Sequence, residues 1–125
     1  MKKTLLLVSA IIVVLSWYSC QYKKEAIDYP ASTCDTSNIR YSVEIVGIMQ
    51  ANCYVCHATA VANSLGGGNK YDSYNNIRPN VASGLLLNCI MQNPGYDAMP
   101  KGGPRISNCD IAKFRTWIRN GYPNN

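Results

Sequence analysis

The chain has 125 residues, of which 47% are hydrophobic and 15% charged; this suits one globular domain with a small core and excludes two domains. Its formal net charge is +5, and Lys2 and Lys3 supply two of those charges. The remaining excess is too small to indicate a nucleic-acid partner, because such partners need a clustered basic face.

The N-terminal segment has the features of an export signal. Lys2 and Lys3 precede an apolar run over residues 4–15, which is shorter than the roughly 20 residues needed to cross a bilayer. The run ends L-S-W-Y-S-C, which resembles a bacterial lipoprotein signal, with residues 1–19 removed before a lipidated Cys20. An ordinary leader and an uncleaved N-terminal anchor are the alternatives. All three interpretations place the chain outside the cytoplasm. The lipoprotein signal further predicts a membrane lipoprotein that faces the periplasm or the outer surface.

Residues 20–37 are polar, include Pro30 and show no apolar periodicity. They are expected to form a flexible tether between the lipid anchor and a domain over residues 38–125. Within that domain, the apolar residues of 41–50 predict a first helix, with Ser42 as its N-cap.

The first helix leads directly into C-Y-V-C-H, residues 53–57, which is the attachment signature of c-type haem. On a helical turn Cys53 and His57 share a face, and Cys56 is next to His57. The two thiols would form thioethers with the vinyl groups of one haem c. The imidazole of His57, the only histidine in the chain, would be the proximal iron ligand.

Two other uses of this pentapeptide were compared with haem attachment. A zinc site requires four ligands, usually from a second pair at similar spacing, and Cys34, Cys89 and Cys109 are not paired in that way. A thioredoxin-type dithiol requires a βαβ context, which we do not find in the sequence. Haem is therefore the favoured interpretation.

A loop and two helices are predicted after the motif. Residues 58–70 contain three consecutive glycines and are interpreted as a flexible surface loop. Asp72 or Ser73 is expected to cap a helix that Pro79 would bend or end. Residues 85–91 predict an apolar helix that forms one wall of the haem site and stops at N-P-G.

Met99 lies in a loop over residues 95–104 that is rich in glycine and proline. A core methionine normally lies on a helix or strand face, so this position predicts another role, as the distal thioether ligand of the iron. Met91 is the rival ligand, but it follows a helical apolar run and packing explains it better. Met49 is too close to the attachment turn to reach the opposite face of the haem.

The last predicted helix begins after Ser107, which is expected to cap it with Asp110 as a partial capping-box partner. Its apolar stripe consists of Ile111, Phe114, Trp117 and Ile118. The helix is expected to end at Gly121.

These segments together resemble a small class I-type monohaem cytochrome c of bacteria. The resemblance covers residues 41–125 and includes C-Y-V-C-H, A-M-P-K-G-G and the terminal F-R-T-W-I-R-N-G-Y-P-N-N. It implies an all-α fold whose first and last helices pack around one haem. Cys53 and Cys56 would then be the thioether sites, His57 the proximal ligand and Met99 the distal ligand. The implied function is one-electron transfer to an unidentified redox partner protein, without enzymatic activity.

Three cysteines remain besides Cys20 and the haem pair. If the terminal helices cross, Cys34 and Cys109 can pair as a disulfide in an oxidising compartment, and the closed loop would stabilise the domain by roughly 4 kcal/mol. Cys89 is expected to be a buried free thiol.

Two alternative functions stay open at this point. A sixth iron ligand that exchanges would indicate a haem-based sensor or a peroxidase-like protein. Zinc in place of haem would indicate a structural lipoprotein.

Overall fold

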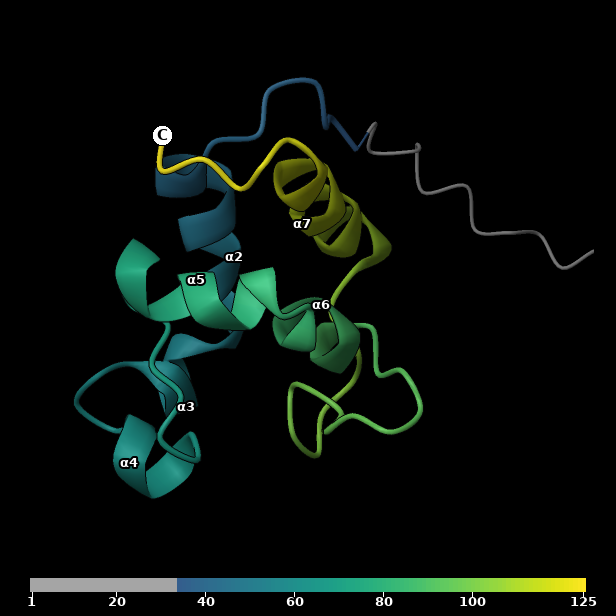
Figure 1. The fold of residues 1–125 in the computed structure, drawn as a ribbon. Coiled ribbons are helices and arrows are strands. Elements are labelled where there is room, and N and C mark those ends of the chain that lie inside the picture. Colours follow the sequence, from purple (N-terminus) through teal and green to yellow (C-terminus); the bar gives the residue numbers. More distant parts are fainter. Residues whose placement is uncertain (1–33) are drawn as a thin grey trace, which may run out of the picture. The chain divides into compact units, whose positions relative to one another are not determined.

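The computed structural model describes residues 34–125, and these form helices joined by turns and loops (Figure 1). In chain order they are the π-helix η1 (Tyr41–Ile45), α2 (Val46–Asn52), α3 (Tyr54–His57), α4 (Ala62–Leu65), α5 (Tyr74–Ala82), α6 (Leu85–Ile90) and α7 (Asn108–Arg119). No strand occurs within residues 34–125, so the all-α prediction is confirmed. The expected signal peptide over residues 1–19, the expected lipidation site Cys20 and most of the expected tether, up to residue 33, lie outside the described residues.

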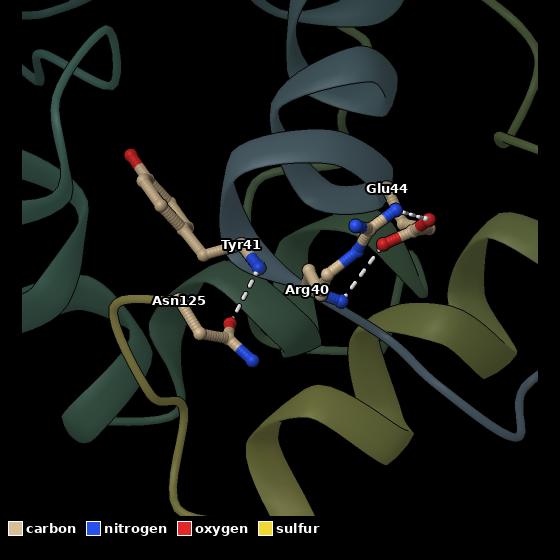
Figure 2. A network of polar contacts seen from close by, with 4 residues as sticks. All are labelled: Arg40, Tyr41, Glu44 and Asn125. Carbon is tan, nitrogen blue, oxygen red and sulfur yellow. Dashed lines mark hydrogen bonds and ion pairs between the residues drawn. The ribbon is translucent and has the colours of Figure 1, made fainter.

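The first predicted helix is present as η1 followed directly by α2, but Ser42 does not cap it. The N-cap is Arg40, and its backbone N–H donates to the Glu44 carboxylate at 2.8 Å (Figure 2). The Arg40 guanidinium also pairs with that carboxylate at 3.4 Å. A carboxylate one turn into the helix thus satisfies a free N–H at the helix start, where negative charge is favoured.

The helix that ends the domain, α7, follows its sequence pattern closely. The Ser107 hydroxyl accepts from the Asp110 backbone N–H at 3.0 Å and donates to the Asp110 carboxylate at 2.8 Å, so the predicted N-cap is confirmed. Phe114 and Trp117 are fully buried, as the apolar stripe predicted. At the other end Gly121 takes φ 84°, a left-handed conformation that favours glycine and terminates the helix.

The first and last helices pack against each other. The rings of Tyr41 in η1 and Trp117 in α7 stack with centroids 5.6 Å apart. The residues after α7 then run alongside the start of η1 (Figure 1). There the Asn125 side chain accepts from the Tyr41 N–H at 2.8 Å, and the Asn125 carbonyl accepts from the Ser42 N–H at 2.8 Å (Figure 2). These contacts satisfy two further N–H groups at the start of η1.

A disulfide joins Cys34 to Cys109 in α7, with the Cα atoms 5.4 Å apart. This is the pairing expected from the sequence. It holds the beginning of the described segment, including residues 34–37 that were assigned to the tether, against the last helix.

Pro79 was expected to bend or end its helix, and the structure shows that it does not end it. Ser73 caps α5 by accepting from the Asn76 N–H, and the helix continues past Pro79 to Ala82. Proline removes one helical hydrogen bond. Burial of Ile77 and Val81 on the opposite side offsets that loss, since both side chains are at most 3% exposed.

None of the helices within residues 34–125 is long and apolar enough to cross a membrane.

Candidate functional site

The C-Y-V-C-H residues form one helical turn, as the sequence predicted. The N–H of His57 donates to the Cys53 carbonyl at 2.8 Å, and the N–H of Cys56 donates to the same carbonyl at 3.1 Å. This turn is α3, and it follows α2 after a break at Cys53. The turn puts both thiols and the imidazole within one short segment.

A cavity of about 300 Å³ is lined by all four residues that the sequence nominated around a cofactor, namely Cys53, Cys56, His57 and Met99. Its volume falls at the lower end of the roughly 300–1,000 Å³ typical of ligand pockets. One wall is α6, which contributes Leu85, Leu86, Cys89 and Ile90. None of the lining residues belongs to α7. The last helix therefore supports the site through the core and not by direct contact with the cavity.

The imidazole of His57 is held in one orientation. Its Nδ1 lies 2.8 Å from the Asn69 backbone oxygen, and its ring stacks on Tyr71 with centroids 4.6 Å apart. A carbonyl oxygen only accepts, so Nδ1 carries the hydrogen and the Nε2 lone pair is free to bind a metal. Metal-ligating histidines commonly have such a carbonyl partner on the other ring nitrogen.

The interpretation of residues 58–70 as a simple surface loop is wrong. The segment contains α4, buries Ala62 and Gly66, and supplies the carbonyl partner of His57. A Cβ at position 66 would lie 2.5 Å from the Cys56 carbonyl oxygen and 2.8 Å from Nδ1 of His57. Glycine is therefore required at position 66 so that this segment can approach the motif closely.

The backbone of Met99 is hydrogen-bonded to α6. Its N–H donates to the Cys89 carbonyl at 3.1 Å, and its carbonyl accepts from the Gln92 amide at 3.4 Å. The other methionines of the described segment have different surroundings. Met49 is 1% exposed in the core, and the Met91 sulfur accepts from the Arg115 guanidinium at 3.2 Å. Neither Met49 nor Met91 lines the cavity.

The thiols of the cavity differ in their surroundings. Burial raises the pKa of Cys53 to about 11. Cys89 is a free thiol as expected, but it is only partly buried and lines the cavity, whereas a buried thiol was expected. Burial first, and then the Asp97 carboxylate, raise the pKa of Cys89. The raised pKa values of Cys53 and Cys89 favour the protonated form of these two thiols.

The donor set suits a covalently attached haem. Two cysteines at the required spacing, one histidine with its Nδ1 already bonded to a carbonyl, and one methionine line the same mostly apolar cavity. Within residues 34–125, no three His, Cys, Asp or Glu side chains converge to form a site that could hold a metal ion by themselves. Haem iron takes its equatorial ligands from the porphyrin and needs only the axial ones from the protein.

No known protein-family model, curated protein or solved structure matches this chain.

Sequence reasoning missed the neighbours of His57, which are Gly66, Asn69 and Tyr71. It also missed Asn80, whose side chain bonds to Asn69 and Tyr71. The run of three glycines was a usable signal, because glycine often marks a close approach of one backbone to another. The two asparagines carried no such signal, since their roles depend on contacts that only the folded chain creates.

Proposed function

We propose that the domain is a one-electron carrier with a single covalent haem c, in the manner of the small class I-type monohaem cytochromes c that its sequence resembles. The observation that carries this proposal is the cavity lined by Cys53, Cys56, His57 and Met99. These residues come from two segments more than 40 positions apart, so their meeting in one apolar cavity is not a consequence of the motif alone.

Each residue has a distinct role in the proposal. Cys53 and Cys56 form the thioethers, His57 binds iron through Nε2, and Met99 supplies the distal sulfur. The haem, when bound, supplies an iron that changes between the ferrous and ferric states. The chain keeps both axial donors in place through the change, because Asn69 holds His57 and α6 holds the Met99 backbone.

The environment of the cavity favours electron transfer over chemistry on a substrate. Its lining is mainly apolar, which excludes water, and His57 is the only histidine of the chain, so no second imidazole is present to act as an acid or base. We further propose that the protein is exported and anchored by a lipid on Cys20, with a redox protein as its partner.

The proposal is tested by expressing the full chain together with a haem-ligation apparatus and recording a reduced-minus-oxidised spectrum. A c-type α-band is expected. It should disappear when Cys53 and Cys56 are both replaced by serine. Mass spectrometry of the exported chain reports the haem, the lipid and the disulfide in one measurement. A colourless exported chain that contains zinc and no iron would overturn the proposal and favour the structural lipoprotein.

The distal ligand is tested by a matched pair of methionine variants. Met99→Ala is expected to open the ferrous iron to rapid carbon monoxide binding and to lower the reduction potential, because a thioether ligand raises that potential. Met91→Ala, which removes a sulfur bonded to Arg115 outside the cavity, should do neither. Rapid carbon monoxide binding by the unmodified chain would instead favour a sensor or a peroxidase-like protein.

A further inference from the structure

We infer that Asn80 is a positioning residue for the iron ligand His57, acting through Asn69 and Tyr71. This inference rests on the proposed function, because it concerns how the chain tunes a histidine that binds haem iron. Asn80 lies in α5, 23 positions after His57, and it does not line the cavity.

Two neighbours fix the imidazole plane. Nδ1–H of His57 donates to the Asn69 backbone carbonyl at 2.8 Å. The Tyr71 ring stacks on the imidazole at an interplanar angle of 22°, and the Tyr71 N–H donates to the His57 carbonyl at 2.8 Å. Asn69 therefore fixes the rotation of the imidazole through the bond to Nδ1, and Tyr71 covers one face of the imidazole.

Asn80 bonds to both of these neighbours with one side-chain nitrogen. Its Nδ2 donates to the Asn69 side-chain oxygen at 3.1 Å and to the Tyr71 hydroxyl oxygen at 3.0 Å. A primary amide has two N–H donors on one nitrogen, so this bridge uses both of them. Neither a single hydroxyl nor a carboxylate can donate twice in this way.

The bridge connects the ligand to a part of the fold that is well packed. Asn80 lies between Ile77 and Val81 in α5, and both of these side chains are buried in the core. Asn69 and Tyr71 belong instead to the irregular segment that connects α4 to α5. Asn80 thus links Asn69 and Tyr71, which hold the imidazole, to the packed helix α5.

This arrangement should tune the iron as well as hold the ring. A strong Nδ1–H to carbonyl bond makes an imidazole more basic and so favours the ferric state. Loosening Asn69 would weaken that bond. The reduction potential should then rise, and the Nδ1 hydrogen should exchange with solvent more readily.

The test uses the haem-loaded full chain and compares Asn80→Ala with Asn75→Ala, a variant of an exposed residue on the same helix. The first readout is the exchange rate of the His57 Nδ1 hydrogen in the ferrous protein by NMR. Because the chain has one histidine, the signal is unambiguous. Asn80→Ala should accelerate exchange by roughly two- to tenfold, which corresponds to the ~0.5–1.5 kcal/mol typical of one hydrogen bond. The second readout is the reduction potential, which should rise.

A second variant keeps the test informative if Asn80→Ala folds poorly. Tyr71→Phe retains the stacked ring and loses the hydroxyl that accepts from Asn80. Tyr71→Phe should shift the exchange rate and the reduction potential in the same direction as Asn80→Ala, by a smaller amount. The variant that carries both substitutions should show less than the sum of the two separate shifts, because the two residues share one bridge.

The outcomes separate the two proposals. A chain that carries no haem overturns the proposed function, and the present inference with it. A loaded chain in which Asn80→Ala and Asn75→Ala have the same exchange rate and potential overturns the role of Asn80 alone.

Discussion

The domain contains two regions that are stabilised by different kinds of contact. The terminal-helix region, made of η1, α2, α7 and residues 120–125, contains the fully buried side chains Trp117, Phe114, Ile45 and Met49. The cavity region, made of α3, α4, α6 and the connecting segments 65–71 and 92–106, leaves Val55 74% and Leu65 61% exposed. It depends more on backbone and amide hydrogen bonds around His57 and Met99.

This difference separates the stability of the domain from the geometry of the cavity residues. Apolar packing contributes free energy in proportion to the area buried and is indifferent to direction, whereas hydrogen bonds and close backbone contacts fix orientation. Substitutions in the terminal-helix region should therefore change the free energy of unfolding and leave the spectrum of the loaded protein alone. Substitutions in the cavity region that disturb the contacts of His57 or Met99 should alter both.

The largest expected effect is that of Trp117→Ala. Trp117 is fully buried, stacks on Tyr41 and donates from its indole nitrogen to the Pro123 carbonyl at 2.9 Å. Its truncation should lower the free energy of unfolding by ~3–5 kcal/mol in urea titrations. The absorption spectrum of the loaded domain below the transition should not change.

Tyr96→Ala is the control, since this residue is 46% exposed and should stay within about 0.5 kcal/mol of the unmodified chain. A Trp117→Ala domain of undiminished stability would contradict the role of this buried side chain in stabilising the core.

The next effect is expected from removing the disulfide. Replacing Cys34 and Cys109 by serine should lower the free energy of unfolding by ~2–4 kcal/mol, towards the upper end because the bridge spans a sequence separation of 75 residues. A thiol reductant should destabilise the unmodified chain and leave the double variant unchanged. Cys89→Ser, which removes a free thiol, should not abolish the sensitivity to reductant. If it does, the bonded pair has been misassigned.

The sequence could predict α7 because local signals determine it, whereas the start of η1, where Ser42 was expected as the cap, depends partly on the distant Asn125. The stripe of Phe114 and Trp117, the Ser107 cap and Gly121 each act within one or two helical turns. The lining of the cavity could be predicted as far as a fixed spacing reports it, which covers Cys53, Cys56 and His57. Met99 could be predicted to lie near them because a loop is an unusual place for a core methionine.

The remaining parts of the site could not be predicted, for physical reasons. The carbonyl of Asn69 and the amide of Asn80 act through contacts that depend on tertiary structure and leave no periodic pattern. Whether α5 continues past Pro79 was left open for a similar reason, because the burial that offsets the lost hydrogen bond is visible only in the folded chain.

Two glycine variants should have effects of opposite sign. Gly66→Ala introduces a Cβ 2.5 Å from a backbone oxygen of Cys56 and 2.8 Å from the His57 ring, so it should destabilise the domain by ~1–3 kcal/mol and shift the reduction potential. Gly47→Ala in α2 meets nothing within 4 Å and should stabilise the domain by ~0.4–1 kcal/mol without changing the potential. Urea titration and redox titration of both variants provide the comparison. Equal effects would mean that the close approach at Gly66 does not constrain His57.

The smallest expected effect concerns the pH dependence of stability near the cavity region. The Asp72 carboxylate accepts from the Thr59 N–H and from the Thr59 hydroxyl, and these bonds hold the pKa of Asp72 below its ordinary value of 3.8. A lowered pKa in the folded state means that the contribution is fully present above the unfolded pKa and is lost as the pH falls through the folded one. Asp72→Asn should therefore lower the free energy of unfolding at pH 7, and its difference from the unmodified chain should shrink as the pH drops below about 4.

Thr59→Val sharpens this measurement because it removes the hydroxyl donor and keeps the backbone donor. The variant should retain part of the pH dependence that Asp72→Asn abolishes. If the difference in free energy of unfolding between Asp72→Asn and the unmodified chain is constant between neutral and acidic pH, the negative charge of the carboxylate makes no contribution. The link between the segment after α3 and the start of α5 would then be a neutral hydrogen bond, without the charge that makes it sensitive to acid.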